Sequence, residues 1–416
     1  MKKIFKFAMF FIAACTMATG ITSCSDDDEV NEGQLTEKEL ALQSLTNQYV
    51  KNVVYPTYSN LAAQTEQLYD QLNEATTKFQ NNTLSQGDIN KICETFLSAR
   101  AYWEKSEAFL YGAATDFGID PHIDTWPLDV FVLANTLSDS WRVDQLKGED
   151  GIEWARTVMA EQLLGFHGIE FIIFRDGKNR TVEALKANET DKNFTGKNVN
   201  GLQELIYATA VAGDLRDKCY QLEVAWMGEN APKAHIDRVE ECEFNTTVNG
   251  IEDLYYGENM LNAAKAGSTY ASWFKVAETI LVSGCSNIAN EVANTKMGQA
   301  YSGEDPNYIE SPYSKKSFID FYDNIISIKN SLYGNFEKEN AENASLMSYL
   351  KKYNATMANE LQANLDNAFK TLNTCINSGS AFVDCPNTPY VKAAMDAIND
   401  LDGKLNEVSE WIKHNH

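Results

Sequence analysis

A helical period of apolar residues runs through almost the whole chain of 416 residues. Between residues 40 and 79, for example, leucine, valine and aromatic side chains recur at steps of three and four, which places them on one face of a helix. Strand-like alternation is nearly absent, and the eight prolines are few enough to leave many helix interiors uninterrupted. Long helices with short polar connections bury their apolar faces on one another, so the sequence predicts an all-α fold made of helix bundles.

Caps and breakers predict where these helices begin and end. One helix is expected from residue 35 to Pro56, a second continues the pattern over 61–79, and a third runs from an aspartate cap at Asp88 to Tyr111, before Gly112. Further helices are predicted over 151–162, 166–174, 199–227, 268–296, 315–333, 345–376 and 390–414. The polar region 228–256 then separates an N-terminal bundle, residues 35–230, from a C-terminal bundle, residues 231–416.

The first 23 residues have the composition of a transport signal. Three lysines precede an apolar run over 7–20, and Ile-Thr-Ser-Cys at 21–24 resembles the lipobox of a bacterial lipoprotein. The apolar run is too short to span a bilayer stably. We therefore expect residues 1–23 to be removed and Cys24 to carry a lipid that attaches the protein to a membrane. An ordinary cleaved signal peptide is the alternative.

The segment 24–34 is polar and acidic and is expected to be a flexible tether. Its Ser-Asp-Asp-Asp-Glu at 25–29 resembles the acidic tag by which some Bacteroidota send lipoproteins to the cell surface. The expected location is the cell envelope, as an outer-membrane lipoprotein that faces the periplasm or the cell surface. We see no other segment apolar enough to cross a membrane.

The net charge of the chain is strongly negative, at −24, with 59 acidic and 35 basic residues. Removal of residues 1–23, which contain three lysines and no acid, takes the charge to −27. Such a surface repels a polyanion, so nucleic acid is not an expected partner. The hydrophobic fraction of 44% is ample for a packed core, so the acidity describes a solvated surface.

Six cysteines remain when Cys15 and Cys24 are set aside. Cys375 and Cys385 are the best candidates for a disulfide, because a helix end and a short Ser-Gly-Ser loop lie between them. The chain has no CxxC spacing, which makes a cysteine zinc site improbable.

The histidine with the most suggestive surroundings is His167, in Gly-Phe-His-Gly-Ile-Glu at 165–170. Glu170 follows three positions later, so both side chains lie on one helix face and can converge on one ligand or ion. A structural hydrogen-bonded pair is the alternative. The segment lacks the second histidine of the helical zinc-protease motifs, and it lacks the repeated Glu-x-x-His of di-iron bundles.

Three further clusters contain chemically useful side chains. The first places a cation, an indole and a carboxylate in line on one helix face, with a core tryptophan beside a surface ion pair as the alternative. The second lies in a loop rich in helix breakers and offers two carboxylates around an aromatic ring. The third has hydroxyls at a helix start and a carboxylate one turn later, with Ser314 as the expected N-cap. Their members are Arg100, Trp103 and Glu107; Asp124, Trp126 and Asp129; and Ser311, Ser314 and Asp320.

Together these segments resemble the imelysin family, especially its iron-regulated, lipoprotein-anchored members. The resemblance rests on GxHxxE at 165–170, RAYWEKSEAF at 100–109, IDTWPLD at 123–129, NEVANTKMG at 290–298 and ESPYSKKSFIDFYDNIISIKNSLYG at 310–334. It spans the chain from about residue 40 to the C-terminus. It implies two four-helix-bundle-like domains with a cleft at their interface near the GxHxxE helix. It also implies a link to bacterial iron acquisition, and the family has a peptidase name.

The resemblance also implies particular site residues. His167 and Glu170 match the family motif, and Glu107, Asp124 and Trp126 match the flanking segments. The chain departs from the family's commoner SPYSWNS at 315–316, where it has two lysines, so no ligand contact is carried over to these positions.

Two hypotheses follow for function. In the first, a lipid-anchored envelope protein binds iron or an iron-bearing ligand around His167 and Glu170, with Glu107 and Asp124 as further oxygen ligands, because hard oxygen donors with one imidazole suit iron or another transition metal. Partners would then be the membrane, iron and other envelope iron-uptake proteins. In the second, the same His167 and Glu170 serve a metal-dependent peptidase. A third possibility is a peptide or haem-like ligand held between Trp126 and Trp103.

Overall fold

The computed structural model describes residues 35–251, 253–336 and 338–415. The predicted signal peptide, the acidic tether and Cys24 lie outside these residues. The described residues from Glu37 onward form one compact unit. The division into bundles at residue 230, and a cleft between them, remain predictions.

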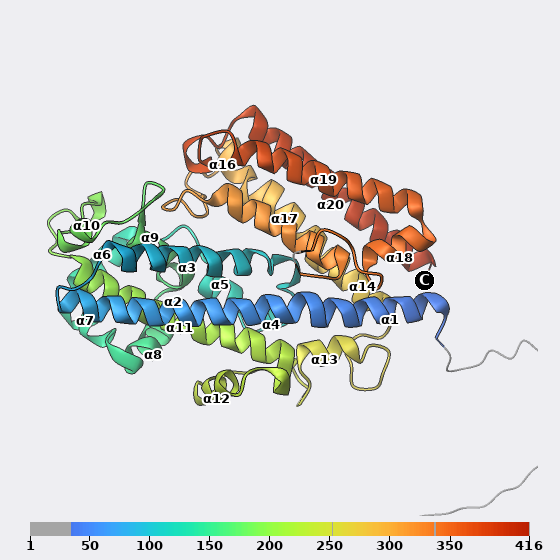
Figure 1. The fold of residues 1–416 in the computed structure, drawn as a ribbon, viewed down its shortest axis with the longest axis horizontal. Coiled ribbons are helices and arrows are strands. Elements are labelled where there is room, and N and C mark those ends of the chain that lie inside the picture. The colour runs from blue at the N-terminus through green and yellow to red at the C-terminus, as the bar shows by residue number, and fades with distance from the viewer. Residues whose placement is uncertain (1–34, 252, 337, 416) are drawn as a thin grey trace, which may run out of the picture. The chain divides into compact units, whose positions relative to one another are not determined.

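The all-α prediction is confirmed, since nearly every element of the described residues is a helix (Figure 1). The helices are α1 (Glu37–Tyr49), α2 (Tyr55–Gln80), α3 (Gln86–Glu104), α4 (Ala113–Asp116), α5 (Ile119–Ile123), α6 (Val130–Ser138), α7 (Ser140–Gln145), α8 (Gly148–Val158), α9 (Gly165–Ile173), α10 (Val182–Lys186), α11 (Gly201–Met227), α12 (Lys233–Glu241), α13 (Tyr256–Leu261), α14 (Trp273–Glu278), α15 (Asn287–Glu291), α16 (Gly298–Ser302), α17 (Ser317–Tyr333), α18 (Leu346–Tyr353), α19 (Ala355–Ile376) and α20 (Pro389–Asn415). Within the described ranges, the strands are β1 (Phe174–Arg175) and β2 (Lys178–Asn179), which pair antiparallel.

The first two predicted helices are continuous. A π-helical turn, Val50–Val54, joins α1 to α2, and Pro56 lies at the start of α2. Proline removes one backbone donor and crowds the preceding turn, and a wider turn accommodates both effects. The expected helix end at Pro56 is therefore wrong, and α1 and α2 form the long blue helix of Figure 1.

The third predicted helix begins earlier and ends earlier than expected. Ser85 caps α3 in a reciprocal capping box with Asp88, so the helix starts before the aspartate. It ends at Glu104, and the 3-10 turn Glu107–Phe109 follows before the chain reaches Gly112. Glu107 therefore lies outside the helix that contains Arg100 and Trp103, so the predicted helix face shared by all three residues is wrong.

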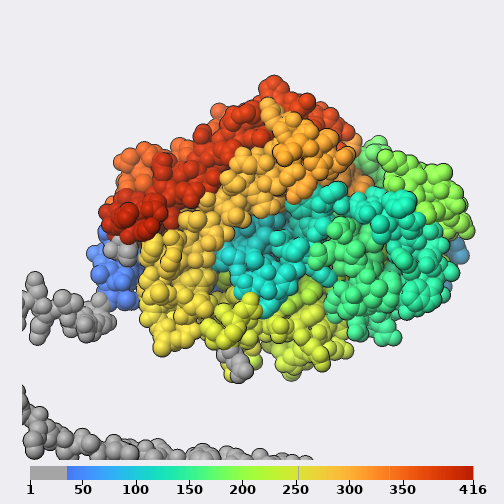
Figure 2. Space-filling model, turned by 180° about the vertical axis from the view of Figure 1, so that it is seen from behind, coloured from blue at the N-terminus to red at the C-terminus, as the bar shows by residue number. Residues whose placement is uncertain are grey.

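Two groups of helices bury most of the apolar surface. In the first half of the chain α2 packs along α11 and α3, and in the second half α19 packs along α20 and α17. The groups touch where α17 contacts α3 and where the 3-10 turn 107–109 meets the π-helical turn Thr279–Ser286. On the face shown in Figure 2, the orange segment lies directly against the cyan one, and the red segment lies on the other side of the orange one.

In the described part of the chain, every helix is too short or too polar to cross a membrane. The six described cysteines are free thiols, so the predicted disulfide between Cys375 and Cys385 is not present in the structure. Instead, the Cys375 thiol donates to the carbonyl of Tyr390 and the Cys385 thiol donates to the carbonyl of Ala381.

Candidate metal centre

Arg100 is the centre of a buried network of charges. It lies on α3, is 2% exposed, and donates to Asp124, the residue that follows α5. Its Nη2 lies 2.6 Å from Glu310 Oε1 and 2.5 Å from Glu104 Oε1. Its Nε lies 3.8 Å from Asp320 Oδ2. One guanidinium therefore holds four carboxylates from three separate parts of the chain.

Asp124 is held from several sides. Trp103 Nε1 donates to its Oδ2 at 2.7 Å, and His167 Nε2 lies 3.1 Å from its Oδ1. Burial raises the pKa of Asp124, but the charges of Arg100 and His167 lower it by a larger amount. The pKa therefore lies below the ordinary value, and the carboxylate is ionised.

His167 reaches Asp124 because α9 begins with a glycine. Gly165 has a φ of +65°, and a Cβ at this position would lie 1.8 Å from the carbonyl oxygen of Ile123. The backbone can approach this closely only where no side chain intervenes. The close approach brings the residue after Ile123, Asp124, next to the imidazole.

Glu170 contacts the other side of the same imidazole. His167 Nδ1 lies 3.4 Å from Glu170 Oε2, and Glu170 Oε1 accepts a hydrogen bond of 2.7 Å from the backbone N–H of Ser314. The predicted convergence of His167 and Glu170 on one helix face is present in the structure. Burial lowers the pKa of His167, but the hydrogen bonds and charges of Asp124 and Glu170 raise it by a larger amount, so the pKa is about 9.

The second half of the chain supplies a second buried cation, Lys296. It is 1% exposed and ends the π-helical turn Val292–Lys296. Its Nζ lies 3.1 Å from Glu310 Oε1, 3.4 Å from Glu107 Oε1 and 3.7 Å from Glu104 Oε2. It also lies 5.2 Å above the ring of Trp126.

Two hydrogen bonds that involve residues of α17 complete the network. Asn324 Nδ2 donates to Glu104 Oε2 at 2.6 Å, and Ser311 donates to Asp320. Burial raises the pKa values of Glu107 and Asp320 well above normal and that of Glu310 to about 7.

The cluster contains more acidic than basic groups. Six of its carboxylic acids are buried: Glu104, Glu107, Asp124, Glu170, Glu310 and Asp320. Its cations among the described residues are Arg100, Lys296 and, because its pKa is about 9, the protonated His167. Ionisation of all six acids would leave an excess of three negative charges, and the raised pKa values of Glu107, Glu310 and Asp320 mean that protons offset part of it. Buried charge of this kind is compensated by protons or by a bound cation.

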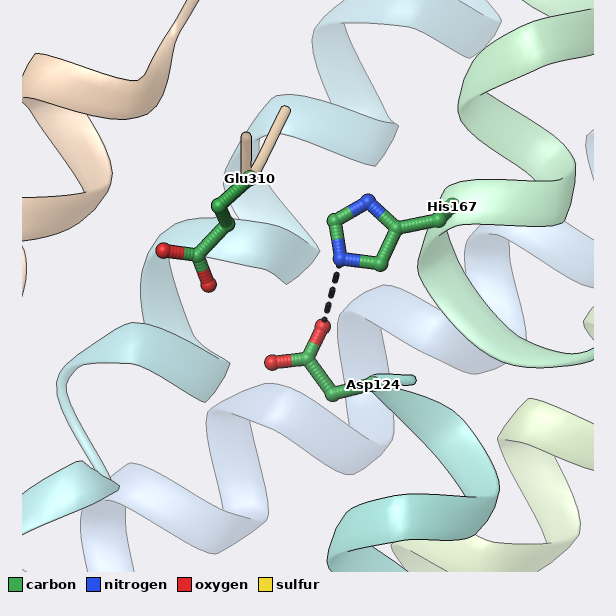
Figure 3. A group of neighbouring side chains, drawn as sticks. All are labelled: Asp124, His167 and Glu310. Carbon is green, nitrogen blue, oxygen red and sulfur yellow. Dashed lines mark ion pairs between the residues drawn. The ribbon is translucent and has the colours of Figure 1, made fainter. Parts of the chain in front are cut away.

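Two groups of these residues could hold a metal ion. In the first, ligand atoms of Asp124, His167 and Glu310 lie within 4.8 Å of one another (Figure 3). In the second, Glu104 and Glu107 join the same Asp124. Glu310 Oε2 is a buried atom without a hydrogen-bond partner, and His167 Nε2 forms an ion pair with Asp124 at 3.1 Å. One imidazole nitrogen and carboxylate oxygens form a donor set that fits a transition-metal ion, which would displace the proton of His167 on binding.

A surface pocket of about 1010 Å³ leads to this group. Its lining includes His167, Trp126, Asp129, Phe131 and Tyr313. A solvated ion or a small ligand could reach His167 through it.

Comparisons with known proteins agree with this architecture. The family model described as imelysin matches residues 54–408. The chain belongs to the imelysin family. Iron-regulated protein A of Synechococcus elongatus is 23% identical over 336 residues, which are 79% of this chain and 75% of that protein.

Two solved structures show the same imelysin fold. A protein named as an iron-regulated protein A precursor from Parabacteroides distasonis has a TM-score of 0.71 and 23% identity, covering 91% of this chain and 96% of its own. An imelysin-like protein from Psychrobacter arcticum has a TM-score of 0.52 and 13% identity, covering 90% and 94%.

The structure of this imelysin brings most of the predicted site residues together. Arg100, Trp103, Glu107, Asp124 and His167 all lie in the buried network, together with the other predicted residues Trp126, Glu170, Ser311, Ser314 and Asp320. The surface ion pair expected beside Trp103 is wrong, because Arg100 is buried. Asp129 lies at the pocket and caps α6 by accepting from the N–H of Val132.

Ser314 does not cap a helix. Lys316 precedes α17, which begins at Ser317, and the Ser314 amide donates to Glu170 instead. Lys315 has a positive φ of 59°, which interrupts helical geometry after Ser314. The expected N-cap is therefore wrong, although Ser314 does contact the site.

Sequence reasoning missed three charged members of the network: Glu104, Lys296 and Glu310. Each had a signal in the chain, since Glu104 lies four residues after Arg100, and the other two lie in the segments 290–298 and 310–334 that resemble the family. None of the three stands out by itself, because a single glutamate or lysine is usually on the surface.

Proposed function

We propose that this imelysin is a lipid-anchored cell-envelope protein that binds iron, or a small iron-bearing ligand, at Asp124, His167 and Glu310. The observation that supports it best is the convergence of the buried His167 imidazole with the carboxyl groups of Asp124 and Glu310, whose ligand atoms lie within 4.8 Å of one another. One imidazole and two carboxylates form a donor set that suits iron.

The remaining residues would position these ligands. Glu170 faces Nδ1 of His167 and so orients the ring with Nε2 toward Asp124. Trp103 and Arg100 fix the Asp124 carboxylate. The positive charge of Arg100 opposes a bound cation, but the six buried acids of the cluster can release protons to compensate it when a cation binds.

The link to iron and the location in the cell envelope are supported by separate observations. The relative from Synechococcus elongatus is named for iron regulation, and the protein from Parabacteroides distasonis is named as a precursor. The lipobox-like residues 21–24 and the acidic segment 25–29 support attachment to a membrane through Cys24. Other iron-uptake proteins of the envelope would be its partners.

Calorimetric titration of the metal-free mature protein with Fe(II) under anaerobic conditions tests the site. We expect His167→Ala to weaken binding by more than about 100-fold and Glu170→Gln by roughly 10–100-fold, because the first removes a ligand and the second removes its orienting partner. His235→Gln is the matched control, since His235 is also buried against a glutamate, Glu223, outside the cluster. Equal binding, or none, in wild type and His167→Ala would exclude this function.

A metal-dependent peptidase remains the second candidate. The family model has a peptidase name, and the pocket that His167 lines is large enough for substrate side chains. Incubation with an unfolded protein substrate, with and without chelator, tests it. Proteolysis that chelation and His167→Ala both abolish would establish a peptidase.

A further inference from the structure

The two possible metal groups share one carboxylate, which is unusual for a site that holds a single ion. Asp124 belongs to the group with His167 and Glu310 and to the group with Glu104 and Glu107. Two ligand groups that share one carboxylate resemble a two-metal site, in which two ions lie about 3.5–4 Å apart.

The ammonium group of Lys296 lies beside the second group, which consists of Glu104, Glu107 and Asp124. Lys296 Nζ is 3.4 Å from Glu107 Oε1, 3.7 Å from Glu104 Oε2 and 3.1 Å from Glu310 Oε1. It therefore contacts two carboxylates of the second group and one of the first.

Burial at this position costs desolvation free energy, because the ammonium group of Lys296 loses its contact with water. The side chain is 1% exposed, and its carboxylate neighbours are 5% exposed or less. A buried ammonium is stable only where acceptors of opposite charge surround it, and here the carboxyl groups of Glu104, Glu107 and Glu310 do so. Lys296 thus does what a bound cation would do between Glu104, Glu107 and Glu310.

We propose that Lys296 occupies the second position of a two-cation carboxylate cluster and so limits the site to one metal ion. This inference rests on the proposed function, because it takes the first ion to bind at Asp124, His167 and Glu310. It adds that the chain's own lysine determines the stoichiometry.

Metal stoichiometry in a lysine variant tests the proposal. Lys296→Met keeps the length of the side chain and removes the charge. Wild type and Lys296→Met are titrated with Mn(II) by calorimetry, and the bound metal is measured by elemental analysis after desalting. We expect one ion in wild type and two in Lys296→Met. Electron paramagnetic resonance should show coupled Mn(II) pairs in the variant alone.

Two control variants separate charge from packing. Lys296→Arg keeps the positive charge and should bind one ion. Lys218→Met removes a half-buried lysine outside the cluster, whose Nζ donates to Gln221, and should also bind one ion. The double variant Lys296→Met/Glu107→Gln removes a ligand of the second position and should return the stoichiometry from two to one.

The outcomes distinguish this inference from the function on which it rests. One ion in both wild type and Lys296→Met, or two ions in wild type, would overturn the role of Lys296 and leave the proposed function intact. No Mn(II) in any variant would also overturn the role of Lys296, whereas the proposed function itself would be overturned by the separate Fe(II) titration of wild type and His167→Ala. Should Lys296→Met be unfolded without metal, refolding by Mn(II) with two ions bound supports the proposal, and failure to refold contradicts it.

Discussion

Gly165 sets the distance between the two residues on which the site depends most. The carbonyl of Ile123 occupies the space where a side chain at position 165 would lie. Because Asp124 follows Ile123 and His167 lies two residues after Gly165, the contact of two backbones determines where both functional groups meet.

Gly165→Ala should therefore destabilise the protein by about 3 kcal/mol or more. A positive φ costs an alanine about 1 kcal/mol, and the clash with backbone adds the cost of displacing α9. Gly196→Ala is the matched control, since Gly196 has a φ of +79° with nothing within 4 Å, and it should lose only about 1 kcal/mol. Urea unfolding measures both, and equal losses would contradict the close approach as the cause.

Among the elements, α3 matters most for the site because it presents Arg100, Trp103 and Glu104 on one face. Its start is fixed by the capping box of Ser85 and Asp88. Lys78, at the end of α2, also donates to Asp88 at 2.6 Å, so the cap links two neighbouring helices.

The stability that this cap adds should depend on pH. The hydrogen bond from Lys78 and those from Ser85 lower the pKa of Asp88 to about 2. A carboxylate with a lowered pKa stabilises the fold fully above its unfolded pKa of about 4, and this stability is lost as the pH falls toward 2.

Asp88→Asn should lower the free energy of unfolding by about 1 kcal/mol at pH 7, a typical value for the loss of a cap. Unfolding of wild type and variant between pH 7 and pH 2 measures the difference. We expect it to stay constant down to about pH 5 and then to shrink. A difference that persists unchanged at pH 2 would show that the charge of Asp88 is not involved.

At the scale of the whole molecule, the buried network connects the two halves of the chain. Arg100 belongs to the first half, while Glu310, Asp320 and Lys296 belong to the second. Asn324 adds a hydrogen bond from α17 to Glu104. A half without its partner would leave these charges buried and unpaired, or exposed to water.

Thermal unfolding of residues 37–416 should consequently be one cooperative transition. In scanning calorimetry the calorimetric and van't Hoff enthalpies should agree, and Asn324→Leu should lower the single midpoint without splitting it. The variant removes a hydrogen bond to a buried charge, worth about 1.5–3 kcal/mol. Two resolved transitions in wild type would instead support independent bundles that meet near residue 230.

Local spacing was sufficient to predict much of this protein. The helical period predicts α11 and α20 to within two residues at each end, and it predicts that His167 and Glu170 share a face. Both features depend on neighbours within one or two turns of a helix, and such neighbours are visible in the chain itself.

Contacts over long distances in the chain were decided by the tertiary structure. Arg100 finds Asp124 and Glu310 at separations of 24 and 210 residues, and Lys296 meets Glu107 at a separation of 189. No period marks such pairs, and each of these residues alone resembles a surface charge. Helix periodicity thus determined the fold class, while the packing of α3, α9 and α17 decided which charges are buried together, because burial depends on what covers a residue.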